Sequence, residues 1–190
     1  ADTSSNNVMI GYYSGRYADY STNSVMIGSY SGYYNSAANN VYMGTRAGYT
    51  NSTGENNVLL GYYSGRYASL NDNNVFLGSY SGYNADYADS CVIIGSFSGR
   101  NADNSLNSVM IGNNCGYNNN GESNVFIGNY SGYSNTSGDN NVFLGYFAGY
   151  SNTASNNVFL GNEAGRTNSS GYQNSFIGYR AGYSTTTGYS

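Results

Sequence analysis

The sequence predicts an all-β solenoid, and three observations support this. A motif of the type Asn-x-Val recurs at steps of 16 or 17 residues through almost the whole 190-residue chain. No window has the i, i+3, i+4 apolar spacing of an amphipathic helix. Each copy holds two runs of β-branched and aromatic residues bounded by Gly and Asn, which is typical of short strands. We therefore expect eleven coils, each with two short strands, in a single β-solenoid domain over residues 1–190.

Each copy contains an apolar triplet whose first residue anchors the repeat. The anchors are Val8, Val25, Val41, Val58, Val75, Val92, Val109, Val125, Val142 and Val158, with Ser175 in the last copy. A first glycine follows every triplet directly, and a second glycine follows four residues later. Coils stacked in register would place identical positions about 4.8 Å apart, so eleven coils predict a rod roughly 50 Å long.

Side chains alternate along a strand, so the first and third triplet residues should share one face and the middle residue the other. We predict that the first and third residues fill the inside of the coil, opposite the small residue that precedes the second glycine. This predicted core ladder comprises the ten valines above with Ile10, Ile27, Ile94, Ile111, Ile127 and Ile177. The Asn before the triplet is expected to form an amide ladder or to cap the turn.

The middle triplet residue is then expected to point outward as an apolar stripe, which marks an interaction surface. This predicted interface ladder is Met9, Met26, Tyr42, Leu59, Phe76, Ile93, Met110, Phe126, Phe143, Phe159 and Phe176. The alternative is a wider coil that takes this ladder into a second internal layer. A predicted surface aromatic ladder, two residues after the first glycine, consists of Tyr13, Tyr30, Tyr63, Tyr80, Phe97, Tyr130 and Phe147.

The composition argues against several classes of function. The chain has 27 Gly and 24 Tyr, two Cys, and no Pro, Trp or His. Without His, the usual zinc sites and nucleophile–base pairs are missing, so we predict no catalytic residue, no metal site, no cofactor and no enzymatic activity. Six scattered Arg and a pI near 4.4 argue against nucleic-acid binding. No apolar stretch approaches the roughly 18 residues of a membrane span.

A few residues leave alternatives open. Cys91 and Cys115 either replace small residues of their ladders or form a disulfide in an oxidising compartment. Asp86 and Asp89 favour turn chemistry over a weak Ca²⁺ site, because the spaced Gly-Gly-x-Gly-x-Asp signature is missing. Glycosylation sequons occur at Asn51, Asn129, Asn135 and Asn168, as chance allows in a chain this rich in Asn, Ser and Thr.

The unit Asn-Asn-Val-Phe-Leu-Gly-x-x-Ala-Gly-Tyr, as at residues 140–150 and, up to its second glycine, at 156–165, resembles the head repeats of trimeric autotransporter adhesins. It also resembles Tyr- and Asn-rich repeats of bacterial surface proteins and phage tail-fibre-like proteins. The resemblance covers nearly the whole chain and implies a left-handed β-roll, three chains per assembly, and binding to host matrix or other surfaces. The chain departs from that family in its longer repeat and in the large residue that follows Val.

These observations predict a non-catalytic structural or adhesive rod that is extracellular, either at a cell surface or in a phage fibre. Its expected partner is itself, as a homotrimer or a head-to-tail fibre, with host surfaces, matrix or glycans as further partners. Neither end shows an atypical capping segment, so we expect a piece of a longer array or a fibre formed by β-augmentation. The alternative is a solenoid that binds a ligand, either a glycan or ice. The lack of a Thr-rich ladder argues against ice.

Overall fold

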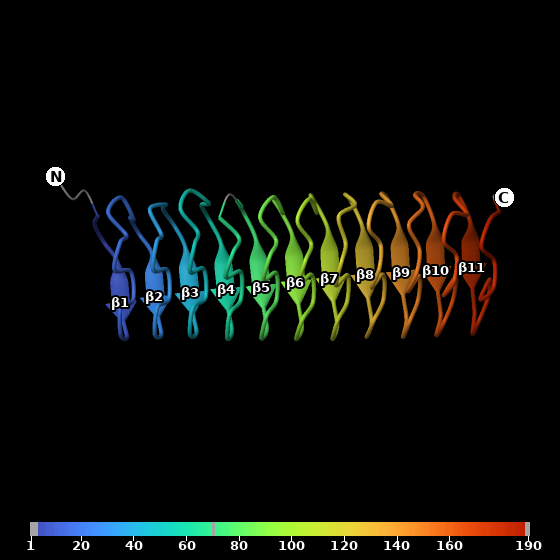
Figure 1. Cartoon of the computed structure of the whole chain (residues 1–190), viewed down its shortest axis with the longest axis horizontal. Helices are drawn as coiled ribbons and strands as arrows, with labels where there is room; N and C mark the ends of the chain where they lie inside the picture. Colours follow the sequence, from blue (N-terminus) through green and yellow to red (C-terminus); the bar gives the residue numbers. More distant parts are fainter. Residues whose placement is uncertain (1–3, 70, 189–190) are drawn as a thin grey trace.

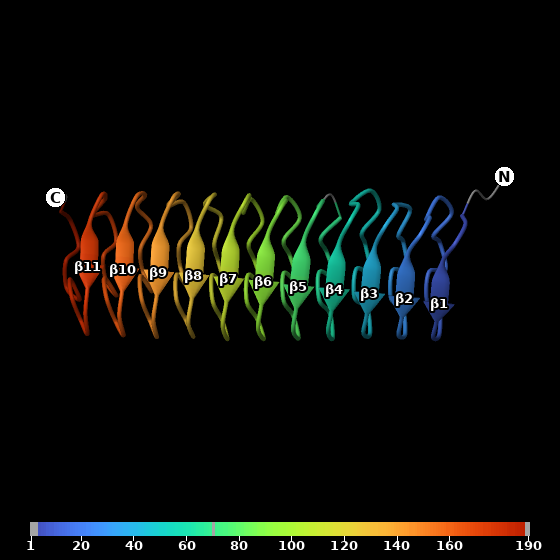
Figure 2. The ribbon, with the colours of Figure 1, turned by 180° about the vertical axis from the view of Figure 1, so that it is seen from behind.

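The structure is a computed structural model that describes residues 4–69 and 71–188. These residues form no helix, and eleven parallel strands of three residues each follow one another in one sheet, which confirms the β-solenoid. The coils stack along one axis into a rod with the two termini at opposite ends (Figure 1), and the same order is seen from behind (Figure 2). The strands are β1 (Val8–Ile10), β2 (Val25–Ile27), β3 (Val41–Met43), β4 (Val58–Leu60), β5 (Val75–Leu77), β6 (Val92–Ile94), β7 (Val109–Ile111), β8 (Val125–Ile127), β9 (Val142–Leu144), β10 (Val158–Leu160) and β11 (Ser175–Ile177).

Neighbouring strands pair in register, so every triplet position lies beside the same position of the next coil. In β9 and β10, for example, Val142 pairs with Val158 and Phe143 with Phe159. Each anchor residue is the first residue of its strand. The register therefore follows the repeat that the sequence displays.

The prediction of two strands per coil is wrong, because the second run forms turns. In the fourth coil, Tyr63 has a φ of 58° and Gly65 a φ of 55°, so both are left-handed and the segment cannot be extended. The turns still bond to neighbouring coils: the Gly65 N–H donates to the Ser81 carbonyl at 2.9 Å, and the Tyr63 N–H to the Thr45 carbonyl at 3.0 Å. Backbone hydrogen bonds thus continue beyond the strand.

The assignment of inside and outside faces is also reversed in the structure. The middle triplet residue, predicted to form an outer interface ladder, is fully buried in most coils, as with Phe76 and Phe143 at 0% exposure. The first and third residues, predicted to form the core ladder, lie on the outside. They are half-buried in most interior coils, whereas Met43, Ile127 and the outer positions of β1 and β11 are exposed. Phe126, Phe143, Phe159 and Phe176 stack inside the rod at centroid distances of 4.7–5.0 Å.

The second glycine explains why the middle residue lies inside. A Cβ on Gly149 would come within 2.4 Å of the Phe143 ring, so only glycine leaves room for that ring. The preceding Ala148 is fully buried beside it, as the sequence predicted for the small residue at this position. Where that residue is Ser, its hydroxyl donates into the next coil, as from Ser131 to the Phe143 carbonyl at 3.1 Å.

The Asn that precedes each triplet forms the expected amide ladder. The Asn57 Oδ1 accepts the Asn74 N–H at 3.0 Å, and its Nδ2 donates to the Asn71 carbonyl at 2.7 Å. Its own N–H donates to the Asn40 Oδ1 at 2.9 Å. One buried side chain thus satisfies two backbone groups of the next coil, which offsets the cost of burying an amide. Among the described residues, Asn74 and Asn141 are exceptions whose buried Nδ2 has no partner.

Three coils are one residue shorter than the others, and the sheet does not change there. The steps from Val25 to Val41, from Val109 to Val125 and from Val142 to Val158 span 16 residues. The strands at all three steps keep the pairing of identical positions. The missing residue is therefore absorbed in the long loop between the second glycine and the next strand.

Truncating a middle residue should cost far more stability than changing its neighbour in the triplet. We expect Phe143→Ala to lower the free energy of unfolding by about 3–5 kcal/mol, because it empties part of the core. Val142→Thr keeps the branched shape on the outer face and should cost less than about 1 kcal/mol. Guanidinium unfolding of both variants measures the difference, and a larger loss for Val142→Thr would contradict the structure.

The amide ladder makes a second stability prediction. Asn57→Ala leaves the Asn74 N–H and the Asn71 carbonyl buried without partners, and each should cost about 1–3 kcal/mol. Asn57→Ser should restore part of this loss, because Ser24 fills the same position and its Oγ accepts the Asn40 N–H at 3.0 Å. If thermal unfolding shows Ser and Ala to be equally harmful, side-chain capping of the next coil is not what stabilises this position.

Candidate interaction surfaces

The outer face of the sheet is a continuous apolar surface, which we call the apolar sheet face. It consists of the first and third residues of all eleven triplets, and Ser175 is its one polar member. Exposure is greatest at the ends, with Val8 at 47% and Ile177 at 72%. From two residues before each triplet to two residues after it, no coil carries a charged side chain. Depletion of charge around apolar side chains is characteristic of the centre of protein interfaces.

A second surface, the Tyr–Arg face, comprises two positions of every coil: the residue two after the first glycine and the residue after the second glycine. It holds seven aromatic residues at each position, all six arginines, Asn114 and Glu163. The predicted surface aromatic ladder lies here, outside the core and in short stacks. Tyr63, Tyr80 and Phe97 have centroids 5.3 and 5.1 Å apart, and Tyr130 and Phe147 are 4.9 Å apart.

The arginines lie among these rings. The Arg66 guanidinium carbon is 4.7 Å from the centroids of both Tyr63 and Tyr67, within the range of cation–π attraction. The Arg66 Nη1 donates to the Tyr83 hydroxyl at 3.1 Å, and the Arg100 Nη1 to the Tyr117 hydroxyl at 2.6 Å. Arg66 is thus held against tyrosines of its own and the following coil, and Arg100 against tyrosines of the coils on either side of it.

A hydrogen bond between neighbouring tyrosines perturbs their ionisation beside this face. A hydrogen bond with Tyr63 raises the pKa of Tyr62 to about 12, with partial desolvation adding to the shift. The same hydrogen bond, with Arg46 and Arg66 close by, lowers the pKa of Tyr63. Tyr63 is therefore the first of the pair to become a phenolate as the pH rises.

Acidic side chains lie elsewhere, on the long loops, and we call this surface the acidic edge. Asp2 lies outside the described residues, and Glu163 belongs to the Tyr–Arg face, where it pairs with Arg166 and Arg180. The remaining acids occupy two loop positions, the fourth residue after the second glycine and the third before the triplet. They are Asp19, Glu55, Asp72, Asp86, Asp89, Asp103, Glu122 and Asp139, all exposed or half-buried.

Carboxylates of the acidic edge bind the backbone of the preceding coil. The Asp72 Oδ1 accepts the Glu55 N–H at 2.7 Å, and the Asp89 Oδ1 accepts the Asp72 N–H at 2.8 Å. Asp86 accepts the Ser69 N–H at 2.8 Å in the same way. Asp86 and Asp89 therefore serve the turns, and no group of three metal-ligating side chains occurs in the described chain.

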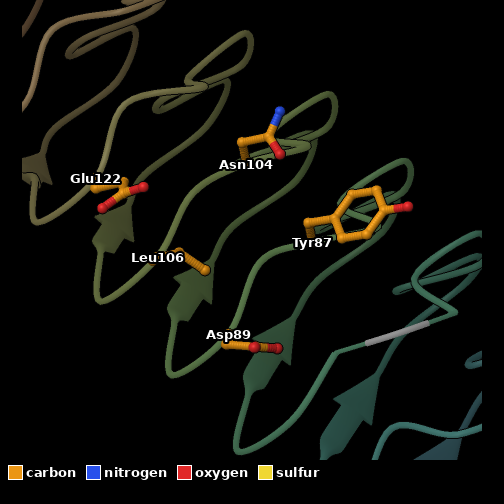
Figure 3. Close-up of a pocket in the computed structure, with 5 residues that line it drawn as sticks. All are labelled: Tyr87, Asp89, Asn104, Leu106 and Glu122. Carbon is orange, nitrogen blue, oxygen red and sulfur yellow. The ribbon is translucent and has the colours of Figure 1, made fainter.

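Two hollows lie on the loop side of the rod. An open groove of about 430 Å³ is lined by Tyr67, Asn84, Asp86, Asn101, Asp103 and Asn120. A smaller pocket of about 200 Å³ is lined by Tyr87, Asp89, Asn104, Leu106 and Glu122. Figure 3 shows Asp89, Leu106 and Glu122 in a row on successive coils, with Tyr87 and Asn104 on the adjoining loops. The pocket is smaller than the roughly 300–1,000 Å³ of typical ligand sites, so it suits a single side chain.

The two cysteines are free thiols in separate ladders. Cys91 takes the place of the Asn before the triplet, and its thiol donates to the Ser105 carbonyl at 2.7 Å. Cys115 replaces the small residue before the second glycine and donates to the Phe126 carbonyl at 3.2 Å. Burial raises the pKa of Cys91 to about 11 and raises that of Cys115 as well, which keeps both thiols protonated and unreactive at neutral pH.

The four glycosylation sequons differ in the burial of their asparagines. Asn51, Asn135 and Asn168 are buried and hydrogen-bonded inside the rod, for example from the Asn135 Nδ2 to the Gly138 carbonyl at 2.7 Å. Asn129 is exposed, so among the four sequons it alone presents its amide to solvent.

Within the described residues there is no helix that could cross a membrane.

No protein-family model, curated protein or solved structure matches the chain in sequence or structure comparison.

Proposed function

We propose that the chain is a non-catalytic structural and adhesive rod that works by assembling with copies of itself. The observation that carries this proposal is the apolar sheet face, an uncharged strip of Val, Ile, Leu and Met along all eleven strands. A long exposed apolar strip with polar margins is characteristic of an interaction surface. A second copy is the partner that matches it best, because its strip is apolar, uncharged and repeats at the same spacing.

The assembly that we favour is a homotrimer, with the apolar sheet faces turned toward a common axis. The chain number and the extracellular location rest on the resemblance of the repeat to adhesin heads. This arrangement leaves the Tyr–Arg face and the acidic edge available to other partners. Tyrosine rings suit adhesion, since they offer a large contact area with little loss of conformational entropy.

Head-to-tail stacking, with β11 of one copy beside β1 of the next, would continue the same backbone pattern. Inside the rod, an anchor N–H donates to the carbonyl that precedes the next triplet, as from Val58 to Asn74 at 2.8 Å. The first glycine of a coil donates back to the preceding coil, as from Gly78 to Leu60 at 2.8 Å. By the same pattern, the Ser175 N–H at one end fits the Asn7 carbonyl at the other. Stacked copies would continue the sheet by β-augmentation.

Native mass spectrometry tests the proposal, and the expected mass is a multiple of the 20.3 kDa chain. The pair Val92→Glu and Ile94→Glu should leave the chain folded but abolish the trimer, since two carboxylates would be buried in the centre of the contact. Thr136→Asp is the matched control, because Asp86 and Asp103 fill the equivalent loop position. A wild-type chain that stays monomeric at all concentrations, or a Glu pair that leaves the mass unchanged, would refute the proposal.

Glycan binding is a second candidate function, favoured by the open groove. Asn84 and Asn101 donate from Nδ2 to the Oδ1 of the next amide at 3.0 Å, which fixes their orientation. Asp86 and Asp103 use Oδ1 for backbone N–H groups at 2.8 and 3.2 Å, which leaves Oδ2 for a ligand. Fixed carboxylates and amides beside the Tyr67 ring suit the hydroxyls and apolar face of a neutral sugar.

A glycan array measures this second function. We expect binding of the wild-type chain to neutral oligosaccharides to fall about tenfold or more in Asp86→Ala with Asp103→Ala, because each lost charged hydrogen bond is worth about 1.5–3 kcal/mol. Asp19→Ala, at the same loop position outside the groove, should bind like wild type. Equal losses in both variants would count against the groove as the sugar site.

A further inference from the structure

The rod separates its charges into two strips that run along different sides. All six arginines lie on the Tyr–Arg face, and eight of the nine described acids lie on the acidic edge. Within the described chain, the two arginine contacts to Glu163 are the only ion pairs. The long loops with the acidic edge run along one margin of the rod, opposite the tight turns that follow the strands (Figure 1). Most charged side chains of residues 4–69 and 71–188 thus form no ion pair within their own chain.

One segment of the Tyr–Arg face has the order Arg66, Tyr83, Arg100, at the same position of three successive coils; we call it the basic triad. The guanidinium carbons of the two arginines lie 5.9 and 5.1 Å from the Tyr83 centroid, on coils either side of it. Each guanidinium has five N–H donors, and the structure gives each one hydrogen bond, to a tyrosine hydroxyl. The Nε of both is buried without a partner, which leaves the outer nitrogens to bind a carboxylate.

The acidic edge carries a segment of matching order, Asp89, Leu106, Glu122, on three successive coils; we call it the acidic triad. Leu106 is the one large aliphatic residue at the position three before the triplet. Five other coils hold Asp or Glu at that position. It lines the pocket of Figure 3 between the two carboxylates, with Tyr87 beside it. The Asp89 Oδ1 is taken by the Asp72 N–H, so its Oδ2 remains as an acceptor.

From these two segments we infer that a second copy of the chain docks laterally, with the basic triad of one rod on the acidic triad of another. The outer members are two coils apart in both triads, about 10 Å. Both arginines therefore meet a carboxylate at once, while the Tyr83 ring lies on Leu106. The pocket has room for one side chain and not for a larger ligand.

This contact joins different surfaces of two copies, so it does not close on itself. A rod whose basic triad is occupied still has a free acidic triad, and a rod whose acidic triad is occupied still has a free basic triad. The contact therefore builds open rows of rods. It goes beyond assembly through the apolar sheet face and does not depend on it. The two interfaces differ in physical character, because one consists of ion pairs and the other of apolar side chains.

Salt concentration distinguishes the lateral contact between the triads from the contact between apolar sheet faces. The Debye length falls from about 30 Å at about 10 mM salt to about 3 Å at about 1 M. We expect static light scattering of the wild-type chain to fall about tenfold or more over this range, because lateral rows dissolve. Native mass at high salt reports the apolar contact separately. Low scattering at low salt and millimolar chain concentration would overturn lateral docking, whatever the mass shows.

Charge reversal locates the contact. Arg66→Glu with Arg100→Glu should abolish lateral association, and so should Asp89→Arg with Glu122→Arg. An equimolar mixture of the two variants should recover it, since each then offers the surface that the other lacks. Arg16→Glu with Arg46→Glu is the matched control on the same face and should associate like wild type. Circular dichroism establishes that each variant is folded.

Three results would overturn the inference: salt-sensitive scattering by either triad variant alone, no recovery of that scattering on mixing, or an equal loss in the Arg16 and Arg46 control. Titration with dextran sulfate covers the other occupant that a basic surface could take. If the wild-type chain binds dextran sulfate through Arg66 and Arg100 but does not scatter at low salt, the basic triad serves an anionic polysaccharide and not a second rod.

Discussion

The structure depends on one constraint: each coil hydrogen-bonds in register to the next, so every side chain lies beside the side chain at the same position one coil away. A residue type whose side chains attract one another can then occupy the same position in coil after coil along the whole rod. Stacked phenyl rings, paired valines and buried asparagine amides all meet this condition. Like charges do not, because they repel across adjacent strands.

This constraint accounts for the way in which charge is distributed. No two successive coils carry arginine at the same position of the Tyr–Arg face, where a tyrosine, phenylalanine or other uncharged residue usually intervenes. Successive carboxylates do occur, as at Asp72 and Asp89, but each accepts a backbone N–H from the preceding coil. That hydrogen bond offsets the repulsion. The low share of charged residues, 8%, is thus consistent with the stacking itself.

The repeat, the register and the solenoid could be predicted from the sequence, because the spacing of identical residues determines all three. The inside and outside of the strand could not, because strict alternation fits both assignments equally well. The deciding signal lay outside the strand, in the second glycine and the small residue before it. In the ninth coil, Gly149 and Ala148 leave a space inside the rod that the Phe143 ring fills. The β-branched valines suggested a core, yet the same residues also suit a half-buried sheet face.

The turns after the strand were missed for a related reason. Aromatic residues such as Tyr63 and Tyr80 favour strands, but here they adopt positive φ values of 58° and 56°. Their N–H groups donate to the preceding coil and Gly65 and Gly82 donate to the following coil, so the turn is held by tertiary hydrogen bonds that local preference does not report. By contrast, the Asn two residues before most triplets, such as Asn73 with a φ of 60°, follows the known tolerance of Asn for this conformation. The separation of arginines from acids could be read from the sequence, once each residue was assigned to its position in the coil.

The three shorter coils show that the long loop accepts a change of length while the strands stay paired. Each coil therefore offers an independent attachment point whose length and composition can vary without disturbing its neighbours. Because the coils follow one another at about 4.8 Å, these points form a ruler with a fixed pitch. A chain built this way can diversify what it displays coil by coil, and its backbone keeps the displayed groups evenly spaced.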